Sequence, residues 1–174
     1  MFYNCQSLTS IPALDTSQVT NMYGLFAYCS SLVSVPDMDT GQVTDMEYMF
    51  YDCSSLVSVP ELDTSQVTGM GSMFEGCSSL TTIPALDTGQ VTNTGFMFLG
   101  CTSLESVTLP GMGNGFTTRQ TLGMRDTKLS AAAANALMQS LGTPAPGGGL
   151  NLPSTAAGAN TSIATAKNWT VTIG

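Results

Sequence analysis

Five cysteines recur at one fixed interval, and their thiols are the first groups to consider for chemistry. They stand 24 residues apart, at Cys5, Cys29, Cys53, Cys77 and Cys101. An odd number at one phase argues against paired disulfides, and parallel side chains in stacked units suit disulfide geometry poorly. Zinc is disfavoured because the chain has no histidine and no CxxC pair. We therefore expect reduced, buried thiols that behave as small hydrophobes.

Carboxylates recur at the same interval, each followed by Thr and then by Ser or Gly. They are Asp15, Asp39, Asp63 and Asp87. Stacked carboxylates are one way to hold calcium, whereas an aspartate at a turn also accepts backbone N–H bonds. We favour the turn, because a calcium loop concentrates several oxygen ligands within one turn. Calcium binding by this row remains the alternative.

Catalysis finds little support in the residue types. The chain has no histidine, and its four bases all follow residue 115, at Arg119, Arg125, Lys128 and Lys167. Neither a nucleophile with its base nor an unsymmetrical acid–base pair is assigned by the pattern. We expect no enzymatic activity, no cofactor and no metal, the alternative being two acids that meet in space.

The charge distribution disfavours two classes of partner. The net charge is −8, and eleven of the twelve acids precede residue 115, where no base occurs. Such a surface repels phosphate backbones and anionic lipid headgroups. No apolar run approaches the roughly 20 residues that span a bilayer. We expect neither nucleic-acid binding nor membrane insertion.

These residues are positioned by a 24-residue repeat that occupies residues 1–110 as four full units and a partial fifth. Apolar residues fall mostly three apart, which fits neither a long amphipathic helix nor an alternating strand. The pattern predicts a repeat solenoid, in which each unit is one coil and like residues stack with parallel strand pairing. Pro12 recurs at one phase, which restricts the paired stretch to Ser7–Ile11 and its equivalents. We expect residues 15–22 to return the chain through a turn or a short helical piece.

Residues 111–174 read as divergent C-terminal repeats and a cap. A helix is predicted between Ser130 and Gly142, then a linker over 144–149, a short helical run over 163–167 and a final strand. Trp169, Val171 and Ile173 share one face of that strand. The first coil has no comparable cap, so we expect an upstream portion or another subunit to cover it.

The repeat pattern FxxCxSLxxIPxLDTSxVTxM, over residues 1 to about 110, resembles the BspA-like leucine-rich repeats of bacterial surface proteins and lipoproteins. The resemblance implies a right-handed leucine-rich-repeat superhelix displayed outside the cell for adhesion or recognition, without enzymatic activity. The end of the chain, TSIATAKNWTVTIG, is similar to terminal segments of repeat proteins from bacterial surfaces and phage tails.

Variation among the repeats concentrates beside the recurring Met-Phe pair. We expect stacking to gather an aromatic and acidic strip there, although singly exposed aromatics also merely shield a corner. The candidate ligand-binding residues are Tyr3, Tyr23, Tyr28, Tyr48, Tyr51, Glu47, Asp52, Glu75 and Phe96, with Asp45 beside them.

The hypothesis is a non-catalytic recognition or adhesion module at a cell surface or virion surface, on a bacterial envelope or a phage tail. It binds a host-surface protein or glycan. The alternative is a structural decoration or fibre subunit that assembles through the exposed N-terminal end of the solenoid.

Overall fold

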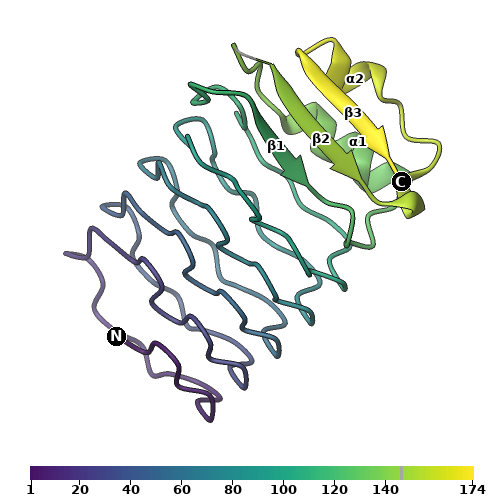
Figure 1. Cartoon of the computed structure of the whole chain (residues 1–174). Helices are drawn as coiled ribbons and strands as arrows, with labels where there is room; N and C mark the ends of the chain where they lie inside the picture. The colour runs from purple at the N-terminus through teal and green to yellow at the C-terminus, as the bar shows by residue number, and fades with distance from the viewer. Residues whose placement is uncertain (146) are drawn as a thin grey trace.

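The computed structural model describes residues 1–145 and 147–174, and successive 24-residue units lie on one another as flattened coils (Figure 1). Three parallel bridges join Asn21 to Asp45, Asp45 to Gly69 and Gly69 to Asn93. Each of these residues therefore meets its own counterpart in the next unit. Within the described residues, no helix is long and apolar enough to cross a membrane.

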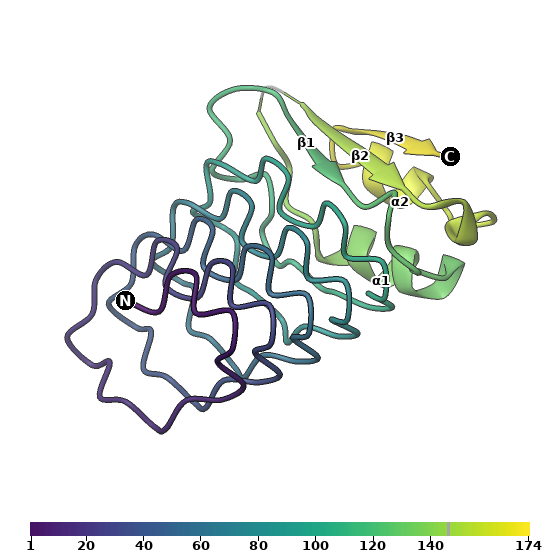
Figure 2. The same ribbon diagram turned by 60° about the horizontal axis from the view of Figure 1, so that its bottom comes forward.

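A three-stranded parallel sheet and a few short helices follow the repeats at the C-terminal end. The strands lie on one side of the stack and the longer helix on the other (Figure 2). The sheet order is β1-β2-β3, with Leu122 opposite Leu150 and Leu150 opposite Val171. The elements are β1 (Gln120–Gly123), α1 (Ala131–Ser140), β2 (Gly148–Leu152), the 3-10 helix η1 (Ser154–Ala156), α2 (Ser162–Thr165) and β3 (Trp169–Ile173).

The predicted C-terminal helix and last strand are confirmed as α1 and β3. The Ser130 hydroxyl accepts the Ala133 N–H at 3.2 Å and begins α1 as an N-cap. The predicted linker is wrong in part, because Gly148 and Gly149 belong to β2, while Pro146 lies outside the described residues. Glycine is depleted in β-strands, so the sequence favours a linker here. In the structure, the Trp169 ring lies 2.5 Å from where a Cβ on Gly148 would stand. The Trp169 ring, opposite Gly148 in the sheet, therefore leaves room only for glycine at this position of β2.

The core of the stack is a set of ladders, one residue type per phase. Phenylalanine rings stack nearly parallel, with centroids 5.6 Å apart for Phe26 and Phe50, 5.7 Å for Phe50 and Phe74, and 6.0 Å for Phe74 and Phe98. These four rings are at most 1% exposed. Spacings of this size lie within the favourable range for aromatic pairs. The repeated phenylalanine therefore packs each coil against the next.

The densest hydrogen bonding between coils lies at one corner, which we call the corner segment: residues 22–29 and the equivalent ranges 46–53, 70–77 and 94–101. Single bonds between coils also recur at the Thr20 phase, as from the Thr44 N–H to the Thr20 carbonyl. In the corner segments alternate N–H groups bond the next coil, and the intervening ones close turns within their own coil, as Leu25 does to the Met22 carbonyl. In the first corner segment the donors Met22, Gly24, Phe26 and Tyr28 bond the carbonyls of Asp45, Glu47, Met49 and Tyr51. The next two interfaces repeat this set with donors Met46, Tyr48, Phe50 and Asp52, and then Met70, Ser72, Phe74 and Gly76.

The prediction that the paired stretch covers Ser7–Ile11 and its equivalents is therefore confirmed only in part, because most of the bonds between coils lie in the corner segments. At the Thr9 phase one backbone bond joins each pair of neighbouring coils, and the Thr82–Ser106 bridge lies beside it. The donors are the N–H groups of Val33, Val57, Thr81 and Glu105, which bond the carbonyls of Thr9, Val33, Val57 and Thr81. A proline that offers no N–H ends that stretch, and no proline recurs in the corner segments. Residues 15–22 form a turn, closed by the Val19 N–H on the Thr16 carbonyl, and hold no helix.

Candidate recognition surface

Each corner segment holds two residues in the left-handed backbone region. One phase holds Gly24, Tyr48, Ser72 and Phe96, with φ between 54° and 58°; the other holds Asn4, Tyr28, Asp52, Gly76 and Gly100, with φ between 54° and 78°. Glycine tolerates this region, whereas a bulky residue there costs on the order of 1 kcal/mol or more. Tyr28, Tyr48 and Phe96 thus place aromatic rings at phases where other coils of the same chain use glycine.

All five tyrosines of the chain meet at this corner, and we call them the tyrosine cluster: Tyr3, Tyr23, Tyr28, Tyr48 and Tyr51. Their ring centroids form a continuous series of contacts: Tyr3–Tyr28 at 5.4 Å, Tyr28–Tyr51 at 5.0 Å, Tyr51–Tyr48 at 5.7 Å and Tyr48–Tyr23 at 5.3 Å. The pairs are edge-on or tilted, which is a favourable aromatic geometry. The cluster is therefore one surface instead of five separate side chains.

The tyrosine cluster surrounds a cavity of about 240 Å³ that also includes Gly24 and Ala27. These two small residues occupy the phases that the next coil fills with Tyr48 and Tyr51. Tyr3 and Tyr23 are 62% and 57% exposed, so the rings stand above the surface around a hollow. The hollow exists because aromatic and small residues alternate between adjacent coils.

Acidic groups border the cluster on two sides. Desolvation, then Tyr48 and the carboxylates Glu47 and Asp45, raise the pKa of Tyr23. Asp52 and Glu75, followed by desolvation, raise the pKa of Tyr51. Both phenols therefore remain protonated hydrogen-bond donors near neutral pH, within a negative field.

Beside Tyr23 the surface continues as a shallow polar groove. The Asn93 side-chain amide donates to Glu47 Oε1 at 2.6 Å, across two coils, and Asn21 donates to Asp45 Oδ2 at 3.3 Å. The groove has a volume of about 370 Å³ and also includes Thr44, Thr68 and Thr92. It offers side-chain oxygens and amides as hydrogen-bonding partners for a polar ligand.

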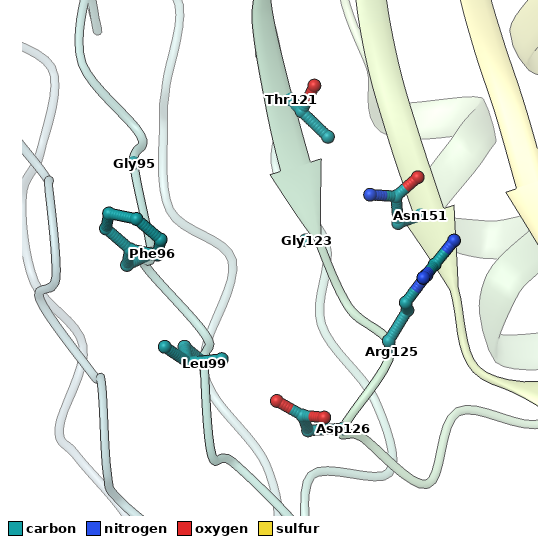
Figure 3. Close-up of a pocket in the computed structure, with 8 residues that line it drawn as sticks. All are labelled: Gly95, Phe96, Leu99, Thr121, Gly123, Arg125, Asp126 and Asn151. Atoms are coloured by element: carbon teal, nitrogen blue, oxygen red, sulfur yellow. The ribbon is translucent and has the colours of Figure 1, made fainter. Parts of the chain in front are cut away.

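Phe96 is a predicted site residue that does not join the tyrosine cluster. It is 69% exposed and stands two coils from Tyr48, a distance of roughly 10 Å at sheet-like spacing. It lines a separate cavity of about 440 Å³, the junction pocket, between the fourth corner segment and the sheet (Figure 3). Its other lining residues are Gly95, Leu99, Thr121, Gly123, Arg125, Asp126 and Asn151.

Sequence reasoning places the tyrosines, Glu47, Asp52 and Glu75 at one corner, and the structure brings them together there. Sequence reasoning misses Asn21 and Asn93, although their recurrence at the Asp45 phase is visible in the sequence. Sequence reasoning also misses Thr121, Arg125 and Asn151. No repeat signal marks these three residues, since they follow the point where the repeat decays.

The cysteines form a row of free thiols. The predicted burial is confirmed for Cys29, Cys53, Cys77 and Cys101 and is wrong for Cys5, which lies exposed in the first coil. Each buried thiol donates to the carbonyl of a phenylalanine in the preceding coil, for example Cys53 to Phe26 at 3.1 Å and Cys77 to Phe50 at 3.1 Å. Desolvation raises the pKa of Cys53 and of Cys101 to about 12. Buried thiols at neutral pH are therefore poor nucleophiles.

The repeated aspartates cap turns, as the favoured interpretation predicts. Oδ1 of Asp15, Asp39, Asp63 and Asp87 accepts the N–H two residues later, at 3.0 to 3.2 Å. The Ser17 hydroxyl and N–H lower the pKa of Asp15, and Ser65 does the same for Asp63. Among the described residues, no group of three or more His, Cys, Asp or Glu side chains is arranged to hold a metal ion.

The family described as "Mycoplasma protein of unknown function, DUF285" matches the chain over residues 1–110 and again over 34–136. The chain belongs to this family. The match is consistent with the resemblance to BspA-like repeats, and it extends beyond residue 110 into α1. No curated protein and no solved structure matches the chain.

Proposed function

We propose that this DUF285 chain is a non-catalytic recognition module, a right-handed leucine-rich-repeat solenoid displayed on an outer surface. It binds a host-surface protein or glycan through the tyrosine cluster. The single observation that carries the proposal is the strained placement of Tyr28 and Tyr48 in a contiguous aromatic surface. Backbone strain at a position where glycine suffices is a mark of a functional constraint.

The chemistry of the cluster defines the class of ligand. Tyrosine rings add large contact area at low entropic cost, and their hydroxyls supply hydrogen bonds. The neighbouring carboxylates Glu47, Asp52 and Glu75 favour a neutral or cationic ligand rich in hydrogen-bond donors. An exposed surface of a protein loop or the hydroxyls of a glycan both meet this description.

The test is binding of the purified chain to host-cell surfaces and to arrayed glycans. The wild type is compared with Tyr28→Ala, Tyr48→Ala and Tyr51→Ala, and with Val33→Ala and Val57→Ala as controls on exposed apolar residues of another face. We expect each tyrosine variant to lose binding by about tenfold or more, as aromatic hot spots do. Equal binding by the tyrosine variants and the wild type contradicts the proposal.

A second candidate function is a structural subunit that assembles through the first coil. An apolar cavity of about 360 Å³ lies there, lined in part by Phe2, Leu14, Val19 and Leu25. Apolar surface of this kind favours contact with another chain. Light scattering across a concentration series separates the two functions. Ordered assembly that Leu14→Glu abolishes supports the structural role, and a monomer at all concentrations contradicts it.

A further inference from the structure

We propose that the junction pocket is a second binding site, for a carboxylate attached to an apolar ring or chain. The site is independent of the tyrosine cluster and lies two coils away from it. It is built where the last corner segment meets the sheet, from backbone donors, an arginine and two exposed apolar side chains.

The argument begins with an interruption of the bonds between coils. In the fourth corner segment the donors equivalent to Met22, Gly24, Phe26 and Tyr28 are Thr94, Phe96, Phe98 and Gly100. None of these four N–H groups bonds a backbone carbonyl within the described ranges that follow. The Thr94 N–H instead donates to Gln120 Oε1 at 3.0 Å, and the Gly100 N–H donates to Asp126 Oδ2 at 3.1 Å.

The two outer donors are thus satisfied by side-chain oxygens, one of them a carboxylate. The Gln120 side-chain amide also donates to the Thr92 carbonyl. This side chain therefore makes bonds that the backbone of a further coil would otherwise make. Asp126 shows directly that this edge accepts a carboxylate oxygen. A carboxylate ligand in the pocket would therefore make the same kind of bond at the adjacent donor.

The two inner donors, the N–H groups of Phe96 and Phe98, have no acceptor in the described part of the chain. Their equivalents in the three preceding coils are all paired, for example Tyr48 with the Gly71 carbonyl and Phe50 with the Met73 carbonyl. An N–H group without an acceptor in the protein is a hydrogen-bond donor that a ligand can use. Phe96 lines the junction pocket, so an oxygen atom bound in the pocket stands beside one of these donors.

The remaining walls match the other parts of such a ligand. Phe96 and Leu99 are 69% and 45% exposed and lie on one side, with Arg125 and Asn151 on the other (Figure 3). The Arg125 side chain extends toward Asn151 (Figure 3), and one guanidinium nitrogen lies 3.9 Å from where a Cβ on Gly174 would stand. Asp126 beside it is engaged by the Gly100 N–H. An arginine and unpaired N–H groups favour an anion with planar oxygens. The cavity of about 440 Å³ is of a size that holds small ligands.

Gly123 supplies a way to close the pocket without disturbing the fold. It lies in β1 on the pocket wall, and a Cβ built on it meets no atom within 4 Å. A valine suits a strand and projects into the cavity. Gly123→Val is therefore a blocking variant that leaves the neighbouring contacts in place.

The experiment titrates the full ¹⁵N-labelled chain with 3-phenylpropionate and, separately, with 3-phenylpropanol, which keeps the ring but has no charge. We expect the acid to bind saturably, with the largest amide shifts at Phe96 and Phe98 and small shifts at Tyr48. The alcohol should bind at least about tenfold more weakly than the acid, which is a difference in binding free energy of about 1.4 kcal/mol.

Four variants test the assignment of the residues. Gly123→Val should abolish binding, and Arg125→Gln and Phe96→Gly should weaken it about tenfold each. Phe96→Gly also removes the strained φ of 58°, so its fold is retained. Lys128→Gln removes a positive charge outside the pocket and should bind like the wild type. Equal affinity for acid and alcohol, or unchanged binding by the well-folded Gly123→Val variant, overturns the proposal. Because the tyrosine cluster is untouched, these results leave the proposed function to its own test.

Discussion

The thiol of Cys53 donates a hydrogen bond to the carbonyl oxygen of Phe26, 3.1 Å away in the preceding coil. The same contact recurs from Cys77 to Phe50 and from Cys101 to Phe74. The cysteine row therefore joins coils through the protonated thiols, and the geometry leaves no sulfur pair bonded to each other.

Native thiol reactivity should be confined to one residue. Cys5 is exposed, whereas Cys29, Cys53, Cys77 and Cys101 are buried. A chromogenic disulfide reagent at pH 8 should react rapidly with one thiol per chain, and with all five after unfolding in guanidinium. The Cys5→Ser variant serves as control and should show no rapid reaction. Rapid reaction of a second thiol in the native state contradicts the burial of the row.

Stability should fall in alkaline solution because burial raises the pKa of these thiols. The folded pKa of Cys53 is about 12, above the ordinary value of 9.0. Its contribution is therefore fully present below pH 9 and is lost as the pH rises toward 12. The slope is on the order of 1 kcal/mol per pH unit for each buried thiol.

Urea unfolding of the wild type and of Cys53→Ala at a series of pH values measures this effect. The wild type should be more stable near neutral pH, and the difference should shrink between pH 9 and 12. The comparison cancels the titration of tyrosines and lysines, which both proteins share. A constant difference over that range contradicts the role of the protonated thiol.

A buried threonine row should contribute more to stability than its exposed counterpart. Thr64 is 2% exposed, and its hydroxyl donates to the Asp87 carbonyl in the next coil at 2.8 Å. Thr64→Val leaves that carbonyl without its partner and should reduce the free energy of unfolding by about 1–3 kcal/mol.

Thr64→Ser keeps the hydroxyl and should lose less. Thr68 is the matched control, since it is exposed and its hydroxyl bonds the Thr44 carbonyl at 3.2 Å. Thr68→Val should change stability by about 0.5 kcal/mol or less. Equal losses in Thr64→Val and Thr68→Val show that burial of the bond is unimportant.

Tyr48→Gly should separate binding from stability. The change removes the strain of φ 58° but also the ring contacts with Tyr23 and Tyr51 and some chain stiffness. These effects oppose one another, so the free energy of unfolding should stay within about 1 kcal/mol of the wild type. Phe50→Ala, in the core ladder, should lose about 3–5 kcal/mol.

Ligand binding by Tyr48→Gly should nevertheless fall by about tenfold or more if the tyrosine cluster is the recognition surface. Thermal unfolding and cell binding on the same preparations measure both quantities. A large loss of stability in Tyr48→Gly indicates that the ring has a packing role instead.

Local rules predicted the features that act within one unit. Asp63 accepts the Ser65 N–H, and Ser130 caps α1, because both bonds join residues that are near in sequence. Repetition then predicted that the tyrosines share one corner, since equivalent residues of stacked units occupy equivalent places. Neither rule predicted that the coils are bonded mainly at the corner segments, because that depends on the direction of each N–H within consecutive turns.

The amino-acid sequence alone determined the 24-residue stacking phase, the cysteine row and the aromatic corner, because identical residues at a fixed period must meet. Only the tertiary structure decided that Phe96 stands apart from Tyr48 and lines the junction pocket. Beyond residue 110 the period ends, and Gln120 and Asp126 bond the edge of the fourth corner segment through side chains in place of a backbone. No local pattern specifies such a bond, because it forms between residues about 26 positions apart whose relative placement depends on the whole packed end of the stack.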